Sequence, residues 1–137
     1  MPSSYVIYYH IIWATKNRTL WITPTIETLV LNAIKEKSHH LQSPIHGINT
    51  MPDHIHVAVT IPPSLSVAKW VQDIKGLSAY KINYEFPDRE ETFKWQKGYS
   101  VRTFGAKALP FVLNYINRQK EHHQNNTLED YLEYLDG

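Results

Sequence analysis

The sequence contains no cysteine, so it can form neither a disulfide nor a cysteine-ligated zinc site. It also lacks internal repeats, low-complexity segments and any apolar run long enough to span a membrane. The apolar stretch near the N-terminus, residues 5–13, is too short and too aromatic for a signal peptide, and no charged region precedes it. We therefore expect a cytoplasmic protein. We also expect residues 1–137 to form a single domain, because this length supports one sizeable core.

The net charge of +1 hides an uneven distribution of charge along the chain. Residues 1–120 carry all 14 Lys and Arg but only eight of the Asp and Glu residues, whereas residues 121–137 carry five acidic residues and no basic one. The sequence therefore predicts a basic body with a short acidic C-terminal tail. Four Trp and nine Tyr accompany the basic residues. This combination is compatible with binding single-stranded nucleic acid, in which cations contact phosphates and aromatic rings stack on bases.

Two histidines open the most strand-like segment of the chain, residues 51–61. Side chains alternate between the two faces of a strand, so Ile55, Val57 and Val59 share one apolar face while His54 and His56 share the other. Two neutral imidazoles that project side by side suit adjacent positions around a divalent metal ion. From the spacing alone, two solvated histidines on an ordinary strand are an equally good interpretation. A metal site needs a third ligand from elsewhere in the chain.

The remaining pattern predicts an α+β fold. Strands are expected over residues 5–14, 45–51 and 54–61 and within 93–104, and helices over 24–41, 66–84, 107–123 and 127–135. This order is typical of a ferredoxin-like, or RRM-like, sandwich, in which a four-stranded antiparallel sheet carries two helices on one face, here followed by a C-terminal helix. If the two helices cover Ile55 and Val57, then His54 and His56 face the open side of the sheet.

Tyr115 and Gln119 lie four residues apart on the helix expected over residues 107–123, so they stack on one side of it. That side is displaced from the apolar stripe that contains Leu109 and Ile116, and we expect both side chains on an exposed flank that is free to meet another surface. Taken alone, the helix is most simply interpreted as carrying an ordinary exposed Tyr and Gln. Together with the histidine pair, Gln119 offers an amide oxygen as a third ligand, and Tyr115 lies one turn away.

Three segments carry a resemblance to a known family. They are Met-Pro-Asp-His-Ile-His at 51–56, Trp-Gln-Lys-Gly-Tyr at 95–99, and Tyr-Ile-Asn-Arg-Gln at 115–119 with two histidines at 122 and 123. In this order they closely resemble the small single-tyrosine HUH transposases of bacterial insertion sequences, the IS200-like family. The chain departs from the usual family pattern at residues 75–80, which are less polar, and in its short acidic tail.

The resemblance implies a role for four residues: His54 and His56 as metal ligands, Gln119 as the third ligand, and Tyr115 as the nucleophile. It further implies Mg²⁺ or Mn²⁺ as cofactor and single-stranded DNA with a hairpin at the element ends as substrate. The family works as a homodimer in which the tyrosine helix of one subunit completes the metal site of the other. The expected reaction leaves a 5′-phosphotyrosine bond and a free 3′-hydroxyl, and another 3′-hydroxyl can reverse it without ATP.

Five basic residues are candidates for contacts with DNA phosphates. Taken one at a time, each is more often an ordinary solvated surface residue. The candidates are Lys16, Arg18, Arg102, Lys107 and Arg118.

Two alternative functions remain open from the sequence. A rolling-circle replication initiator or relaxase shares the histidine pair and the tyrosine, although such proteins usually carry further domains. A non-catalytic single-stranded nucleic-acid binding module would use the open face of the sheet, as RNA-recognition domains do. We disfavour a two-histidine phosphoesterase, because the chain lacks His-x-Ser/Thr motifs. We also disfavour a histidine-triad hydrolase, because Ala58 stands where a third alternate histidine is needed.

Overall fold

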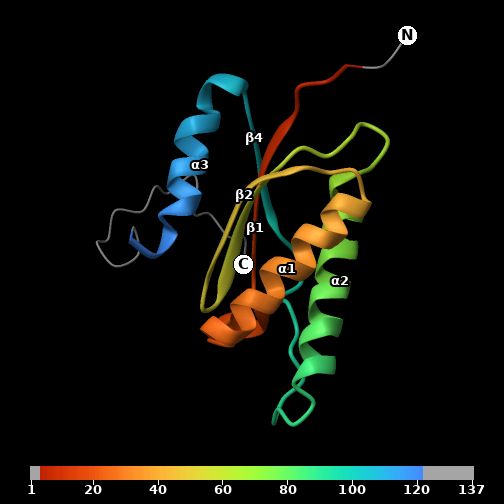
Figure 1. Ribbon diagram of the computed structural model, residues 1–137, viewed down its shortest axis with the longest axis vertical. Coiled ribbons are helices and arrows are strands. Elements are labelled where there is room, and N and C mark those ends of the chain that lie inside the picture. The colour runs from red at the N-terminus through yellow and green to blue at the C-terminus, as the bar shows by residue number, and fades with distance from the viewer. Residues whose placement is uncertain (1–3, 122–137) are drawn as a thin grey trace.

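The computed structural model describes residues 4–121, and their elements follow the order expected from the sequence (Figure 1). They are β1 (Tyr8–Ala14), η1 (Lys16–Arg18), α1 (Pro24–His40), β2 (Ile45–Met51), β3 (His54–Val59), α2 (Val67–Glu85), β4 (Ser100–Phe104), η2 (Ala106–Ala108) and α3 (Leu109–Asn117). The strands form one antiparallel sheet in the order β2-β3-β1-β4. The predicted ferredoxin-like α+β fold is confirmed.

Several elements differ from the prediction at their ends. Strand β1 begins at Tyr8 rather than at residue 5, and β3 ends at Val59 rather than at residue 61. The helix expected over 107–123 is a 3-10 turn followed by α3, because Pro110 is favoured in the first turn of a helix rather than in its interior. Helix α3 ends at Asn117, and helical backbone resumes after a turn at Arg118. The helix expected over 127–135 lies outside the described residues, as does the acidic tail beyond residue 121.

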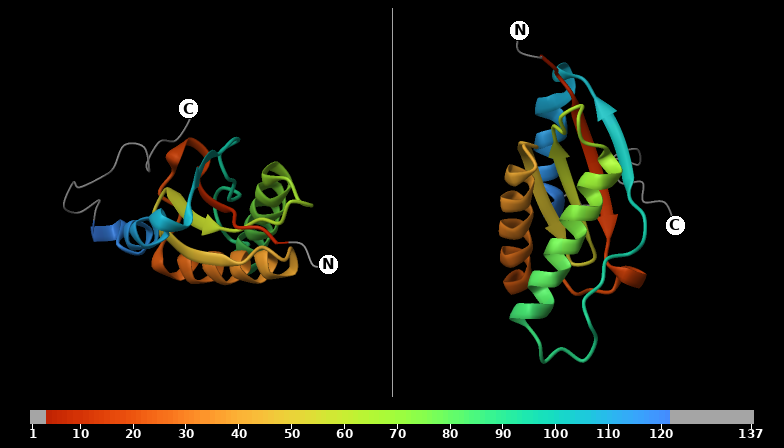
Figure 2. Two further views of the ribbon diagram at one scale, coloured as in Figure 1. Left: turned by 90° about the horizontal axis from the view of Figure 1, so that it is seen from above. Right: turned by 90° about the vertical axis from the view of Figure 1, so that its right-hand side faces the viewer.

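Helices α1 and α2 cover one face of the sheet, and they bury the apolar side of β3 (Figures 1 and 2). Ile55, Val57 and Val59 are fully buried there, as the alternation in the sequence predicted. Both helices begin at a side-chain cap: the Thr23 hydroxyl accepts a hydrogen bond from the Ile26 amide, and Ser66 caps α2 in the same way. This core packs against one face of the sheet.

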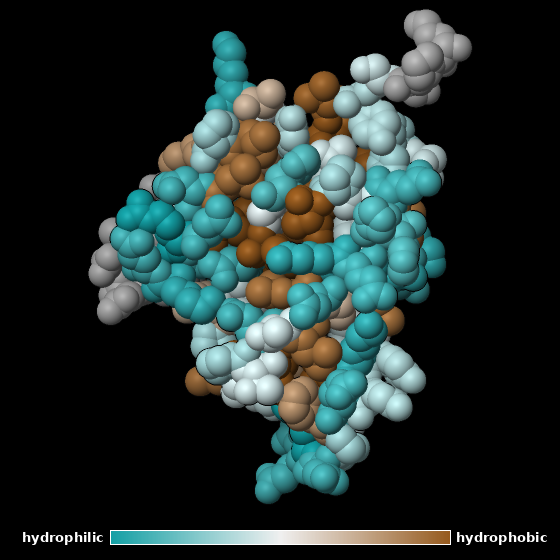
Figure 3. Space-filling model, in the orientation of Figure 1, coloured by the Kyte–Doolittle hydropathy of each residue, from teal (hydrophilic) through white to brown (hydrophobic). Residues whose placement is uncertain are grey.

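Helix α3 packs on the opposite face of the sheet, across β2 and β3, so the strands lie between α3 and the α1/α2 pair (Figure 2). Ala58, Val112 and Ile116 form a small buried apolar cluster between this helix and the sheet. A band of apolar surface lies between α3 and α1 (Figure 3). The prediction that this face of the sheet is open was therefore wrong, because α3 covers the part of it formed by β2 and β3.

Strand β2 is shaped to receive α3. Gly47 lies at an irregularity in the pairing of β2 with β3, and a Cβ atom there would lie 2.9 Å from Leu113 Cδ2. Two positions further along β2, the Asn49 amide nitrogen donates hydrogen bonds to the carbonyl oxygens of Ile116 (3.1 Å) and Asn117 (3.4 Å). Carbonyl groups in the last turn of a helix have no partner within the helix, so Asn49 both caps α3 and attaches it to the sheet.

Replacing Asn49 with alanine is expected to loosen α3 without disturbing the rest of the fold. The change removes hydrogen bonds that contribute about 1 kcal/mol each, so amide hydrogens of residues 112–117 should exchange about fivefold faster or more, while those of β1 and β3 keep their rates. Asn32→Ala, at an exposed position of α1, is the matched control and should leave α3 unchanged. Hydrogen exchange measured by mass spectrometry tests this. Equal protection of α3 in wild type and Asn49→Ala would contradict it.

Candidate active site

The register of the sheet places His54 and His56 on the face that α3 covers. His54 lies opposite Ala14 of β1, and His56 lies opposite Ile12. Both imidazoles are buried, with exposed fractions of 2% and 0%, and their ring centroids lie 5.2 Å apart at an interplanar angle of 63°. The side-by-side pair that the sequence predicted is therefore present, but it lies beneath a helix rather than in solvent.

Each imidazole of the pair is held by a hydrogen bond to its Nδ1 atom. His54 Nδ1–H donates to Asp53 Oδ1 at 2.7 Å, and Asp53 Oδ2 accepts a hydrogen bond from Arg18 Nε at 2.9 Å. These bonds, above all the one from His54, lower the pKa of Asp53 to about 2. A hydrogen bond of 2.9 Å joins His56 Nδ1 to His10 Nε2. Because Nδ1 of each ring is engaged, Nε2 is the atom through which each ring can bind a metal ion.

Helix α3 brings Tyr115 to the imidazole pair. The Tyr115 ring lies against His56, with ring centroids 6.2 Å apart, and the side chain is only 2% exposed. The prediction that Tyr115 lies on an exposed flank was wrong. The side of α3 that meets the sheet contains Val112, Tyr115 and Ile116, and the polar imidazole face of β3 accommodates a phenol that an apolar face would not.

Gln119 is fully buried, so its predicted exposure was wrong as well. The neighbouring Lys120 anchors this part of the chain to β2: its ammonium group donates to Asn49 Oδ1 (3.0 Å) and to the carbonyl oxygen of Thr50 (3.0 Å). It also pairs with Glu27 Oε2 of α1 at 2.8 Å. Asn49 lies opposite His56 in the sheet, so the anchor holds the segment that carries Gln119 at the histidine end of β3.

The donor groups in this region fit a divalent cation that accepts both nitrogen and oxygen ligands. Imidazole nitrogens from His54 and His56, with an amide oxygen from Gln119, suit Mn²⁺, and amide and water oxygens also suit Mg²⁺. Among residues 4–121 no group of three or more His, Cys, Asp or Glu side chains is arranged to hold a metal ion. A cation bound by His54 and His56 would therefore need an amide ligand, for which Gln119 is the predicted candidate, and oxygen atoms supplied by solvent or substrate.

Comparison with known proteins identifies the family of the chain. A family profile described as "Transposase IS200 like" matches residues 3–119. The chain belongs to the IS200-like transposase family. Its relatives include the ISDra2 transposase TnpA of Deinococcus radiodurans, which is 22% identical over 85% of this chain and 86% of that protein. They also include the transposase for insertion sequence element IS200 of Salmonella typhimurium, which is 28% identical over 82% of this chain and 76% of that protein.

Solved structures show the same fold. A putative transposase from Deinococcus radiodurans superposes with a TM-score of 0.71 and 23% identity, over 87% of this chain and 95% of that one. A REP-associated tyrosine transposase bound to a REP hairpin gives a TM-score of 0.66 and 15% identity, over 90% of this chain and 73% of that one. As an IS200-like transposase, this protein is a DNA-processing enzyme. None of the helices described within residues 4–121 is long and apolar enough to cross a membrane.

The basic residues of the transposase that were predicted to contact phosphates are all exposed, and two of them lie close to the histidines. Lys16 and Arg18 belong to η1, which follows β1 directly. The backbone of η1 is held next to the turn between β2 and β3 by a hydrogen bond from the Thr15 amide to the Asp53 carbonyl (2.9 Å). Arg18 pairs with Asp53, and the other oxygen of that carboxylate accepts the hydrogen bond from His54. Arg18 therefore contacts the histidine pair indirectly, through Asp53.

The other three basic candidates are spread along the α3 side of the transposase. Arg102 of β4 lies opposite His10 in the sheet register, Lys107 belongs to η2, and Arg118 pairs with Glu121 after the end of α3. The contacts of all five candidates with DNA remain predictions.

Sequence analysis missed three residues that support the site: His10, Asp53 as the partner of His54, and Asn49. His10 is the one histidine within the first strand, and a polar residue in an otherwise apolar strand is a signal in itself. Its position beside His56 depends on the register of β1 against β3, which periodicity along the chain does not reveal.

Replacing Asp53 with asparagine removes the charged partner of both His54 and Arg18. The pKa of Asp53 is lowered to about 2 from 3.8, so the ionised carboxylate stabilises the folded state above pH 4, and this contribution is lost as the pH falls through about 2. We expect Asp53→Asn to lower the free energy of unfolding by about 1 to 2 kcal/mol at pH 7, and by less at pH 3. Urea unfolding at both pH values measures this.

Asp73→Asn is the matched control, because the Asp73 side chain is 20% exposed against 21% for Asp53 and pairs with Lys69 on the surface of α2 at 2.9 Å. Loss of that surface pair should cost less than about 0.5 kcal/mol at pH 7. Equal losses in the two variants would show that the contacts of Asp53 with His54 and Arg18 add nothing to stability.

Proposed function

We propose that this transposase cuts and rejoins single-stranded DNA through a covalent bond between the Tyr115 phenol oxygen and a 5′ phosphate. The observation that carries the proposal is the packing of Tyr115 against His56, on the face of the sheet that also holds His54. His54, His56 and Gln119 are the proposed ligands of Mg²⁺ or Mn²⁺. A bound divalent cation favours the phenolate, polarises the scissile phosphate and neutralises charge that develops on its oxygens.

In the proposed reaction, the phosphate exchanges its bond to the 3′ oxygen for a bond to the tyrosine oxygen. Tyr115 Oη attacks phosphorus and loses its proton; the new O–P bond replaces the bond to the 3′ oxygen, which leaves and takes up a proton as a 3′-hydroxyl. A free tyrosine is ionised in only about one molecule per thousand at pH 7, so the phenol depends on the charge of its surroundings. Because the tyrosine ester retains the energy of the phosphodiester, an incoming 3′-hydroxyl reverses the step and joins a new strand.

The burial of Tyr115 means that α3 must leave its docked position before a phosphate can reach the phenol. Its apolar contact with the sheet is small, and its polar anchors are Asn49 and Lys120. If α3 instead docks on the imidazole face of a second subunit, the site of its own subunit opens. The site of the second subunit then receives the tyrosine in trans. We therefore propose a homodimer whose active form exchanges the tyrosine helices, with the docking seen in the single chain as the closed form.

The proposed substrate is a hairpin near the ends of an insertion sequence, in line with the REP hairpin bound to the similar tyrosine transposase. Lys16, Arg18 and the other exposed basic residues are the proposed phosphate contacts. A non-catalytic module that binds single strands on an open sheet face is disfavoured, because α3 covers the part of the face that carries the histidines.

Incubation with single-stranded hairpin DNA and Mn²⁺ is expected to give a protein–DNA adduct that survives denaturation and maps to the peptide containing Tyr115. Tyr115→Phe should bind the hairpin with wild-type affinity and form no adduct, because the attacking oxygen is gone. Tyr84→Phe, at a 70% exposed position of α2, is the control and should keep the wild-type yield. Gel electrophoresis and mass spectrometry measure both.

The DNA for this assay is taken from imperfect palindromes that flank the gene. An adduct that persists in Tyr115→Phe would assign the nucleophile to another residue. Hairpin binding by wild type without any adduct would favour the binding module.

Mixing two inactive variants tests completion of the site in trans. Tyr115→Phe retains the histidines, and His56→Ala retains the tyrosine, so a mixed dimer contains one intact site only if the tyrosine acts on the partner's histidines. After subunit exchange at equal concentrations, we expect about a quarter of the wild-type adduct yield. A mixture as inactive as its two components would show that Tyr115 acts on the histidines of its own subunit.

A further inference from the structure

We propose that His10 is a positioning residue of the metal site, which holds His56 in the orientation and tautomer that present Nε2 to the cation. His10 is not one of the proposed ligands, and it contacts neither DNA nor cation in this scheme. The inference rests on the proposed function, since it assigns a role to His10 in the same site.

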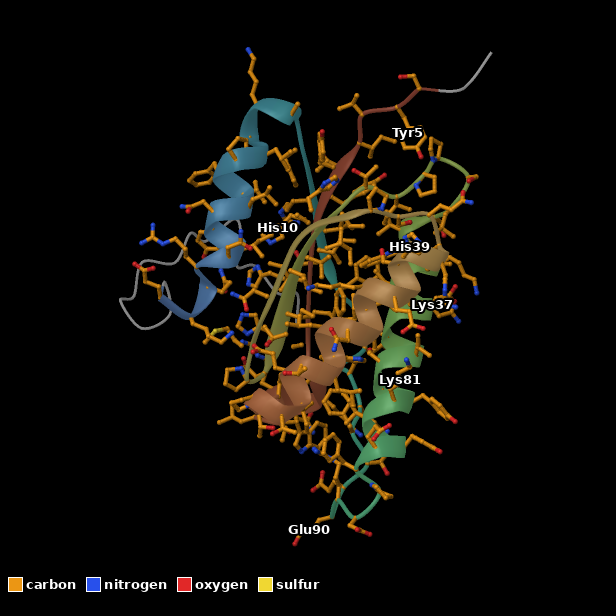
Figure 4. All side chains as sticks on the ribbon, in the orientation of Figure 1. Tyr5, His10, Lys37, His39, Lys81 and Glu90 are labelled. Carbon is orange, nitrogen blue, oxygen red and sulfur yellow. The ribbon has the colours of Figure 1, made fainter. Side chains whose placement is uncertain are left out.

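His10 is placed where an apolar residue is expected. It lies in the middle of β1, opposite Ala58 of β3 and Arg102 of β4, on the face covered by α3 (Figure 4). His10 is 1% exposed, so it is buried as deeply as the neighbouring Ile12 on the same face, which is 3% exposed. Burying an imidazole costs free energy unless the ring is hydrogen-bonded, so the contact that His10 makes with His56 is specific to a polar ring at this position.

The contact between the two rings restrains His56 directly. His10 Nε2 lies 2.9 Å from His56 Nδ1, and the ring centroids are 5.1 Å apart at an interplanar angle of 33°. A ring joined at Nδ1 in this way cannot rotate about its Cβ–Cγ bond without breaking the bond. The imidazole is therefore fixed with its Nε2 atom on the side away from His10.

The hydrogen bond also couples the tautomer of His56 to that of His10. One proton lies between the two nitrogen atoms. When it resides on His56 Nδ1, neutral His56 carries no proton on Nε2 and can ligate a cation through that atom; when it resides on His10 Nε2, neutral His56 must carry its own proton on Nε2 and cannot ligate through that atom. A metal-binding His56 therefore requires His10 as the acceptor. Asp53 is the corresponding acceptor for His54, so in this scheme each ring of the pair has an acceptor at its Nδ1 atom.

Three variants separate positioning from packing. His10→Leu removes the acceptor and keeps a side chain of similar size; His10→Gln offers an amide group near the position of Nε2; Ile12→Val is the control, because Ile12 lies opposite His56 but its side chain cannot form a hydrogen bond. The tautomer of His56 is read from long-range ¹H–¹⁵N NMR spectra of the metal-free protein. The affinity for Mn²⁺ is measured by titration calorimetry.

In His10→Leu we expect the His56 ring to change from one tautomer to a mixture, and Mn²⁺ binding to weaken by about 10-fold to 100-fold. His10→Gln should recover part of the affinity, and Ile12→Val should bind within about twofold of wild type. Hairpin binding without a cation should be the same in all four proteins. A single His56 tautomer and wild-type Mn²⁺ affinity in His10→Leu would overturn the proposal.

Two further outcomes are also decisive. If His10→Leu does not fold, His10→Gln is compared with His10→Asn, whose shorter amide does not reach His56; equal Mn²⁺ affinity and equal tautomer populations in these two would overturn the proposal. If wild type binds no Mn²⁺, the cation is removed from the proposed function. The His56 tautomer in the metal-free variants then still shows whether His10 positions the ring.

Discussion

The burial of two imidazoles and a phenol beneath α3 is the constraint on which the rest of the site depends. A polar group that is removed from water without a hydrogen-bonding partner costs about 1 to 3 kcal/mol, so each group needs a partner within the protein. Asp53 and His10 are such partners for the two imidazoles, and Asn49 binds the last carbonyl groups of α3. These partners come from β1, β2 and the turn between β2 and β3, so the fold itself fixes the geometry of the site.

The two faces of the sheet are covered to very different extents. The face toward α1 and α2 contributes to a large apolar core that includes Ile55, Val57 and Trp70, whereas α3 is held by a small apolar cluster and a few polar contacts. Segments with little buried apolar surface open locally at a lower free energy than the core. We therefore expect α3 to open at a lower free energy than the part of the sheet that carries the histidine pair. A fixed pair of imidazoles and a removable tyrosine helix are what the proposed strand exchange through Tyr115 would require.

The sequence was sufficient for the order of the strands and helices within the described residues, though not for all of their ends, and for the face on which the histidines lie, because both follow from local periodicity. Alternation along residues 54–59 placed Ile55 in the core and His56 opposite it, and the structure confirms this. The burial of Tyr115 and Gln119 was not predictable in the same way, since polar residues on a helix flank normally face water. Their burial depends on an imidazole face supplied by a strand about 60 positions away. The contact of His10 with His56 likewise depends on the pairing register of two strands.

The proposed site is tested most directly by locating where the paramagnetic ion Mn²⁺ binds. In NMR spectra of the transposase titrated with Mn²⁺, we expect the signals of His54, His56 and the Tyr115 ring to broaden first and together. Tyr80 and Tyr84, which are exposed on α2 beyond the opposite face of the sheet, should stay sharp at the same concentration. Broadening centred on any other part of the molecule, with the Tyr115 ring unaffected, would contradict the claim that α3 carries the nucleophile to a cation held by the paired histidines.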